Sequence, residues 1–290
     1  MTTPGQQAAL SKEQIDSVVA LYSNGHYQEA IDQIKSLNVS HPNVPFLFNL
    51  IGACYKELGK TQGALKMFET ATKLKPDYAE AFKNIGITYR DLGKFDLATE
   101  HLKKSILIQP NYLDAHYNLA ITYKESNHNE NAIKGYEKVI EINPDFAPAY
   151  NNLGNIFRGL GRKKSAVEYY EKAIQVNPKF AEAYNNLGNT FRDIREREKA
   201  LICFERAREI KPDMEFVFGD ILNSKMQLCL WNNLQNFVNE LIDRINNREK
   251  VIAPFPLLSL IDSLQSLKMN TEVFVKKIYP KSNVLPQIDL

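Results

Sequence analysis

The sequence predicts an all-α fold, a right-handed superhelical solenoid of helix–turn–helix repeats with C-terminal capping helices. Two observations predict it: a proline recurs at a fixed interval, and the apolar residues inside each interval follow helical periodicity. The prolines are Pro42, Pro76, Pro110, Pro144, Pro178 and Pro212, each 34 residues after the one before (76 − 42 = 34). A fixed period of about 20 to 50 residues indicates stacked repeats, and stacked repeats usually bind other chains.

With the proline at position 32, the chain divides into six repeats, 11–44, 45–78, 79–112, 113–146, 147–180 and 181–214. One repeat cannot bury its apolar face alone, so the repeats must stack. We expect residues 1–10 to be a disordered N-terminus. Residues 215–250 are expected to form a degenerate repeat with capping helices, and residues 251–290 a connector-like tail.

The first helix of each repeat is predicted from a large residue at position 4, Leu at 7, a small residue at 8 and an aromatic residue at 11. The fifth and sixth repeats carry Tyr150, Leu153, Gly154 and Phe157, and Tyr184, Leu187, Gly188 and Phe191. At about 100° per residue these positions share one helix face. We expect the helix to end at Gly59, Gly93 and Gly161, because glycine suits the left-handed residue after a helix.

The second helix is predicted from Ala at position 20, an aromatic residue at 24 and Ala at 27, and it ends at the proline. The same two repeats carry Ala166, Tyr170 and Ala173, and Ala200, Phe204 and Ala207. These positions form the tetratricopeptide (TPR) pattern, and the chain resembles TPR proteins over residues 45–214.

Both ends depart from the pattern. Gln14 and Ser17 replace the large residue and the Leu of the first repeat, as suits a solvent-facing terminal repeat. After the sixth repeat, one apolar stripe predicts a helix over about 232–247. Its residues are Leu234, Val238, Leu241, Ile242 and Ile245.

Composition argues against several classes of function. The formal net charge is +2 and the pI about 8.2, whereas nucleic-acid-binding domains usually exceed a pI of about 9. Cys54, Cys203 and Cys229 follow no motif spacing and fit a reduced, intracellular compartment. No secretory signal or membrane-spanning stretch is recognisable. We therefore expect a cytoplasmic protein that binds neither nucleic acid nor membrane.

Catalytic motifs are missing from the sequence. The five histidines show no metal-ligand spacing. The sequence contains no phosphate-binding loop, nucleophile elbow or dinucleotide fingerprint. We expect no catalytic residue, no metal site and no cofactor.

Positions 2, 5, 6, 9, 12 and 13 of each first helix lie opposite the packed face and are expected to line a concave groove. Asparagine recurs at position 6 as Asn84, Asn118, Asn152 and Asn186, and at position 9 as Asn155 and Asn189. Cations recur at position 12 as Lys56, Arg90, Lys124, Arg158 and Arg192. Position 13 carries Glu57, Asp91, Glu125, Gly159 and Asp193.

Two interpretations of these columns remain open. An asparagine amide has both an acceptor and two N–H donors, so a row of them can hold an extended polypeptide by its backbone. Alternatively, the asparagines hydrogen-bond between repeats and the charges form exposed inter-repeat ion pairs worth little. Asparagine is a mediocre helix former, which favours a binding role for its column. For the charged columns the ion-pair interpretation is favoured.

A closer resemblance lies in two kinds of segment. The repeats read AYNNLGN at both 149–155 and 183–189, and they are followed by CLW at 229–231, IAPFPLL at 252–258 and YP at 279–280. The sequence of these repeats is similar to that of the TPR half of O-linked N-acetylglucosamine transferases and their SPINDLY-like relatives. The later segments are similar to the connector that precedes their catalytic domain.

The resemblance implies that the asparagine row binds acceptor polypeptide and passes it to a glycosyltransferase, either covalently joined or a separate partner. The catalytic domain would begin about where this sequence ends, at Leu290. We therefore expect the chain to recognise a substrate without transferring a sugar itself. The alternative is a free-standing adaptor that assembles a protein complex through the same groove. The sequence identifies neither the bound protein nor an oligomeric state.

Overall fold

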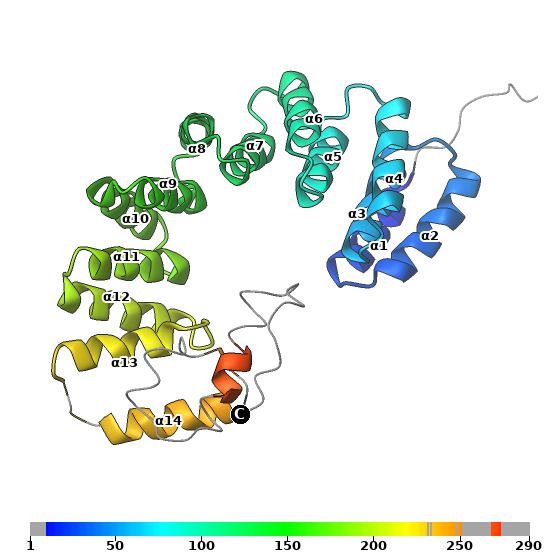
Figure 1. The fold of residues 1–290 in the computed structure, drawn as a ribbon. Helices are drawn as coiled ribbons and strands as arrows, with labels where there is room; N and C mark the ends of the chain where they lie inside the picture. Colours follow the sequence, from blue (N-terminus) through cyan, green and yellow to red (C-terminus); the bar gives the residue numbers. More distant parts are fainter. Residues whose placement is uncertain (1–9, 231, 233, 248, 251–267, 274–290) are drawn as a thin grey trace, which may run out of the picture. The chain divides into compact units, whose positions relative to one another are not determined.

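The computed structural model describes residues 10–230, 232, 234–247, 249–250 and 268–273. These residues form successive helix pairs and no β-strand (Figure 1). The helices are α1 (Lys12–Ser23), α2 (Tyr27–Ser40), α3 (Pro45–Glu57), α4 (Thr61–Leu74), α5 (Ala79–Asp91), α6 (Phe95–Ile108), α7 (Leu113–Glu125), α8 (Asn129–Ile142), α9 (Ala147–Gly159), α10 (Lys163–Val176), α11 (Ala181–Asp193), α12 (Arg197–Ile210), α13 (Val217–Gln227) and α14 (Leu234–Asn246). A further helical turn covers 268–273. The predictions of an all-α fold and of stacked helix pairs are confirmed.

The proline at position 32 explains where each second helix ends. Helix α4 stops at Leu74, and Lys75, directly before Pro76, is extended with φ −134° and ψ 91°. A proline ring disfavours the α conformation of the residue before it, so the helix cannot continue. The same backbone occurs at Gln109, Asn143, Asn177 and Lys211.

The turn inside each pair depends on a left-handed residue. Gly59, Gly93 and Gly161 have φ of 71°, 71° and 74°, which confirms the prediction for these three glycines. Asn127 and Arg195 occupy the same place in the fourth and sixth repeats, with φ of 61° and 66°. Asparagine tolerates this conformation better than arginine, so Arg195 is the more strained of the two.

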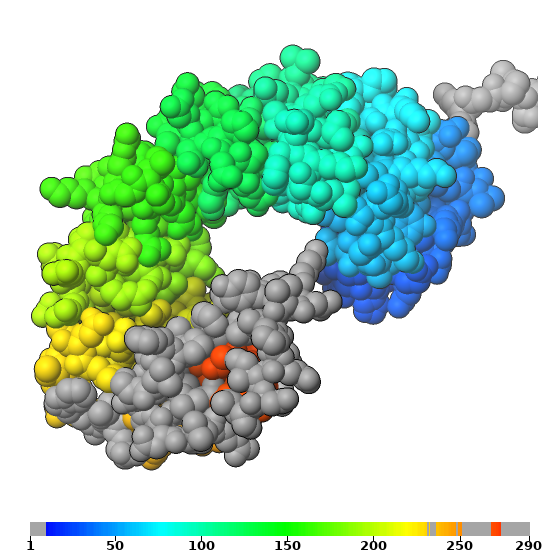
Figure 2. All heavy atoms as spheres, viewed as in Figure 1, coloured from blue at the N-terminus to red at the C-terminus, as the bar shows by residue number. Residues whose placement is uncertain are grey.

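The chain divides into two compact units, residues 1–144 and 145–290. In the first unit, α1, α2 and α3 enclose a cluster that includes the fully buried Val18, Ile31, Ile34 and Leu47. Leu10, the last residue of the segment expected to be disordered, packs against this cluster. Figure 2 shows the blue-to-green atoms of this unit as a continuous packed body.

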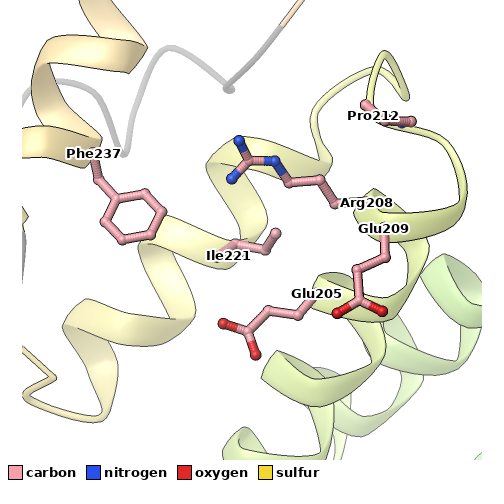
Figure 3. A pocket seen from close by; sticks show the side chains of 6 residues that line it. All are labelled: Glu205, Arg208, Glu209, Pro212, Ile221 and Phe237. Carbon is pink, nitrogen blue, oxygen red and sulfur yellow. The ribbon is translucent and has the colours of Figure 1, made fainter.

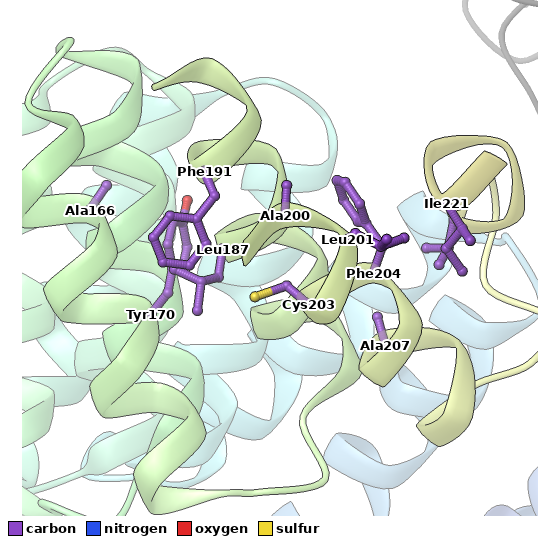
Figure 4. Packing of buried hydrophobic residues seen from close by; sticks show 11 residues of the cluster. Ala166, Tyr170, Leu187, Phe191, Ala200, Leu201, Cys203, Phe204, Ala207 and Ile221 are labelled. Atoms are coloured by element: carbon purple, nitrogen blue, oxygen red, sulfur yellow. The ribbon is translucent and has the colours of Figure 1, made fainter. Parts of the chain in front are cut away.

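Figure 4 shows the main buried cluster of the second unit. The cluster joins α10, α11, α12 and α13 through Tyr170, Leu187, Phe204 and Ile221. Glycines set the distance between paired helices: a Cβ on Gly154 would lie 2.6 Å from the Tyr170 ring, and one on Gly188 would lie 2.7 Å from the Phe204 ring.

The fourth repeat reverses this arrangement. Its position 8 is Ala120, and the facing helix accommodates the methyl group with Gly135. A Cβ on Gly135 would lie only 2.8 Å from the Ala120 Cβ. The close approach is therefore preserved with the small residue moved to the other helix.

The segment after the sixth repeat continues the stack. The helix predicted over about 232–247 is confirmed as α14. Phe218 and Leu222 of α13 pack with Leu241 and Ile245 of α14, and Met269 joins them. Residues 1–9, 251–267 and 274–290 lie outside the described residues, so the predictions for the N-terminus and for most of the tail remain predictions.

We expect Phe204→Ala to lower the free energy of unfolding by about 3–5 kcal/mol, because the ring is fully buried. Ile202→Ala on the same helix removes a side chain that is 64% exposed, and its effect should stay within about 0.5 kcal/mol. Urea unfolding measures both. Equal losses would show that α12 does not pack through Phe204.

Gly135→Ala should destabilise the protein by about 1–3 kcal/mol, because the added methyl group meets Ala120. Adding Ala120→Gly should recover most of that loss, since the second change removes the opposing methyl group. Thermal unfolding of both single variants and the double variant gives the coupling between the two sites. Strict additivity would contradict the proposed contact.

Candidate functional site

The predicted columns lie on the side of each first helix that faces away from the core. In α5, Ala81, Ile85 and Thr88 are buried, whereas Asn84 is partly exposed and Asp91 is exposed. Helix α11 repeats this division. Column residues are therefore placed to meet a ligand, and their hydrogen bonds determine which of their atoms are available.

Two asparagines of position 6 tie neighbouring repeats together. The Asn84 Nδ2 donates to the Asn49 Oδ1 at 3.0 Å, and the Asn186 Nδ2 donates to the Asn151 Oδ1 at 2.9 Å. Both acceptor residues are nearly buried, with 4% and 9% of their surface exposed. Asn49 and Asn151 stand at position 5, which carries Ile, Lys or Tyr in the first, third and fourth repeats, so no unbroken column in the sequence points to them.

The same bonds orient the amides. Because Nδ2 of Asn84 and Asn186 points toward the preceding repeat, the Oδ1 atom is the end left to accept a hydrogen bond. These two residues thus serve the inter-repeat role and keep an acceptor on the side of the helix that faces away from the core. Orientations of this kind follow from the hydrogen-bond network.

The asparagines of position 9 have the opposite orientation. The Asn155 Oδ1 accepts from the Tyr170 hydroxyl at 2.8 Å, and the Asn189 Oδ1 accepts from Arg192. Burial raises the pKa of Tyr170 to about 12, so its phenol is protonated at neutral pH and acts as the donor. With the oxygens occupied, the NH₂ groups of Asn155 and Asn189 are the ends left to bind a ligand.

Two members of the asparagine row differ. Both ends of Asn118 are engaged: its Oδ1 accepts from Arg90 at 2.8 Å, and its Nδ2 donates to the Asp114 carbonyl at 2.8 Å. Asn152 also has an interaction with the protein. The row is therefore not uniform, and its two orientations are clearest at Asn186 and Asn189 of α11.

The cations of position 12 form an inter-repeat ladder with the acids of position 13. The Lys56 Nζ lies 3.0 Å from Asp91, and the Arg158 Nη2 lies 2.8 Å from Asp193. Arg90 makes the corresponding contact with Glu125 at 3.7 Å, whereas Arg192 pairs with Asp220, which stands at position 6 of the following helix pair. These pairs are partly exposed, so each contributes little to stability. Lys124 forms no ion pair within the described residues of the first unit.

Asp220 shows what burial does to one of these acids. It sits at position 6 of the helix pair after the sixth repeat, where the third to sixth repeats carry Asn. Burial raises the pKa of Asp220, although the Arg192 guanidinium beside it acts in the opposite direction. Among the described residues, the neighbouring Asn185 Oδ1 is buried and has no hydrogen-bond partner. Asp220 accepts from Arg192 and has no N–H to donate, whereas an asparagine at its position could donate to Asn185.

Apart from the columns, a cleft lies beside α12, α13 and α14 (Figure 3). This cleft of about 590 Å³ is lined by Glu205, Arg208, Glu209, Pro212, Ile221 and Phe237. Its charges are already paired: Glu205 with Lys225 at 2.7 Å, Glu209 with Arg206 at 2.7 Å and Arg208 with Glu240 at 2.6 Å. We therefore regard the outward side of the first helices, which carries the asparagines of positions 6 and 9, as the better candidate for a binding site. We call this side the asparagine face.

Other chemistry finds little support among the described residues. No group of three or more His, Cys, Asp or Glu in that part of the chain could hold a metal ion. Burial raises the pKa of the Cys54 and Cys203 thiols to about 11, which leaves them poor nucleophiles. In the same residues, none of the helices combines the length and apolar character needed to cross a bilayer.

Models of known repeat families match several parts of the chain. Models described as tetratricopeptide repeat match residues 47–78, 79–112, 147–180 and 169–201, and a TPR repeat model matches 122–161. Helix pairs of this kind are typical of non-catalytic interaction modules. A comparison with curated proteins found no match.

Solved structures share the fold. The structure of MamA is 29% identical, with a TM-score of 0.51 over 56% of this chain and 95% of that one. YrrB, described as a TPR protein with an unusual peptide-binding site, is 19% identical, with a TM-score of 0.50 over 67% and 97%. The Cut9–Hcn1 structure from the APC/C is 13% identical, with a TM-score of 0.60 over 88% and 48%.

We expect Asn186→Ala to destabilise the protein by about 1–2 kcal/mol, because it leaves the buried Asn151 Oδ1 without a donor. Asn189→Ala should change stability by less than about 0.5 kcal/mol, since Arg192 retains Asp220. Chemical denaturation distinguishes the two variants. A neutral Asn186→Ala would remove the inter-repeat role assigned to this residue.

Proposed function

We propose that this chain, which contains tetratricopeptide repeats, is a protein-binding module. It holds an extended polypeptide by its backbone along the asparagine face. One observation carries the proposal: Asn186 and Asn189 of α11 offer opposite ends of their amides on the same helix face. The free oxygen of Asn186 accepts a peptide N–H, and the free NH₂ of Asn189 donates to a peptide C=O.

The spacing suits an extended ligand. Residues three apart on a helix have Cβ atoms about 5–6 Å apart. An extended chain rises about 3.3 Å per residue and presents N–H and C=O groups along its edges. Asn155 adds a second donor one repeat earlier. An extended backbone therefore finds donors and acceptors within reach, largely regardless of its sequence.

The energies limit what backbone contacts achieve. Each hydrogen bond contributes about 0.5–1.5 kcal/mol net. Three bonds, from Asn155, Asn186 and Asn189, thus supply about 1.5–4.5 kcal/mol, a Kd no tighter than about 0.5 mM. Tighter binding requires side-chain contacts. In the second unit the proposed surface also includes Asn152, Arg158 and Arg192. In the first unit the corresponding surface comprises Asn84, Asn118, Lys56, Arg90 and Lys124, with Asn118 the least available because both of its amide ends are engaged.

The finer proposal is that this surface presents polypeptide to a sugar-transferring enzyme in the cytoplasm. The AYNNLGN wording at 149–155 and 183–189 supports it. The segments at 252–258 and 279–280 lie outside the described residues. Immunoprecipitation of the native product, followed by an assay with UDP-N-acetylglucosamine, tests the idea. Transferase activity in the precipitate would support it, and an inactive precipitate would favour the adaptor alternative.

We expect an extended Ser/Thr-rich 12-residue peptide to bind weakly and to shift the side-chain NH₂ signals of Asn155 and Asn189 in an NMR titration. Asn155→Ala combined with Asn189→Ala should weaken binding about 5- to 100-fold, the equivalent of two lost hydrogen bonds. The control is Asn246→Ala, at an exposed residue of α14.

A peptide analogue with N-methylated amides separates backbone from side-chain recognition. Its side chains are unchanged, but it lacks the N–H groups that Asn186 would accept. Binding that is indifferent to N-methylation and to both asparagine changes would contradict the proposal.

A further inference from the structure

We propose that the first unit recognises side chains of the bound polypeptide. It selects an extended segment in which an apolar residue stands two positions before an acidic residue. This inference rests on the proposed function, because it assumes that a polypeptide lies on the asparagine face. The selecting surface is one stripe of α7, formed by Tyr117, Ile121 and Lys124. These residues follow the i, i+4, i+7 spacing of a single helix face.

Lys124 differs from the neighbouring cations because it has no counter-ion among the described residues of the first unit. The other cations on the outward sides of α3 and α5 are engaged: Lys56 with Asp91 at 3.0 Å, Lys83 with Asp114 at 3.7 Å, and Arg90 with Asp91 at 3.3 Å and Glu125 at 3.7 Å. Lys124 is only partly exposed and has no ion-pair partner among the described residues of its unit. Its ammonium can therefore receive a carboxylate from outside.

The residue at position 9 is polar in the second unit and apolar in the third and fourth repeats of the first unit. The fifth and sixth repeats carry Asn155 and Asn189 there, whereas the third and fourth carry Ile87 and Ile121. Both isoleucines are partly exposed on the outward side of their helices. An apolar side chain of the ligand gains from covering them, while a backbone carbonyl finds no donor at this position.

Tyr136 supports a ligand at the same place. Its counterpart Tyr170 donates its hydroxyl to Asn155, but Ile121 stands at the corresponding position and cannot accept. The Tyr136 hydroxyl is fully buried and has no hydrogen-bond partner in the part of the chain that the structure describes, and its ring packs on Tyr117 with centroids 5.9 Å apart. Ile121 and Lys124 thus present an apolar side chain followed by an ammonium that has no ion-pair partner among the described residues of its unit, beside the buried Tyr136 hydroxyl.

The geometry sets the spacing in the ligand. Ile121 and Lys124 are three residues apart, so their Cβ atoms lie about 5–6 Å apart. In an extended chain, residues i and i+2 point to the same side and are about 6.6–7 Å apart. An apolar residue on Ile121 therefore places the second residue along at Lys124, and the ammonium there favours aspartate or glutamate.

The test uses three 12-residue Ser/Thr-rich peptides that contain Leu-Ser-Asp, Leu-Ser-Asn or Ala-Ser-Asp, titrated into the full chain. We expect the wild type to bind the Leu-Ser-Asp peptide about three- to fivefold more tightly than the Leu-Ser-Asn peptide, the size of a partly exposed ion pair. Lys124→Gln should abolish this preference. Lys134→Gln, at an exposed lysine of α8, is the matched control and should retain it.

Further arms separate the possible failures. Ile121→Ser should abolish the preference for Leu-Ser-Asp over Ala-Ser-Asp, with thermal unfolding confirming that the variant is folded. If Lys124→Gln keeps the aspartate preference, the inference is overturned. If the three peptides bind equally but remain sensitive to Asn189→Ala, this inference fails and the proposed function stands. Absence of any peptide binding would overturn both.

Discussion

The structure depends on one constraint: a pair of short helices cannot bury its own apolar face and must stack on its neighbours. Stacking requires close helix approach, and each repeat achieves it by setting a small residue against a large one. Gly154 beneath the Tyr170 ring and Gly188 beneath the Phe204 ring show the usual arrangement. Ala120 against Gly135 shows that the approach is retained when the small residue changes sides.

The stacking also creates the candidate site. Because every first helix uses one side for the core, the opposite side repeats at the same interval and lines up columns of polar residues. Hydrogen bonds between repeats, as at Asn186, and within a repeat, as at Asn189, then fix the orientation of those residues. The NH₂ group of Asn186 donates to Asn151, which leaves its oxygen to accept a further hydrogen bond. The oxygen of Asn189 accepts from Arg192, which leaves its NH₂ group to donate. A structural role thus leaves one end of the same amide for the proposed binding role, so the two interpretations of the asparagine column are compatible.

Sequence periodicity was sufficient to predict the helices, because Pro76 and its equivalents end them and Gly59 and its equivalents turn them. It also predicted where the asparagine and cation columns lie. It could not predict the amide orientations, which depend on partners such as Asn151 and Tyr170. Nor could it show that Asn118 is engaged at both ends. Those features depend on contacts between helices, which a column of identical letters does not distinguish.

The most direct test of the account is photo-cross-linking from two positions in the second unit, in the presence of an extended peptide. Glu182 of α11 lies one turn before Asn186 on the asparagine face, whereas Ile202 of α12 is exposed on a second helix. With p-benzoylphenylalanine at each position in turn, we expect peptide adducts from position 182 and few from position 202. Equal adducts from both, or adducts mainly from position 202, would contradict the claim that the asparagine face binds polypeptide.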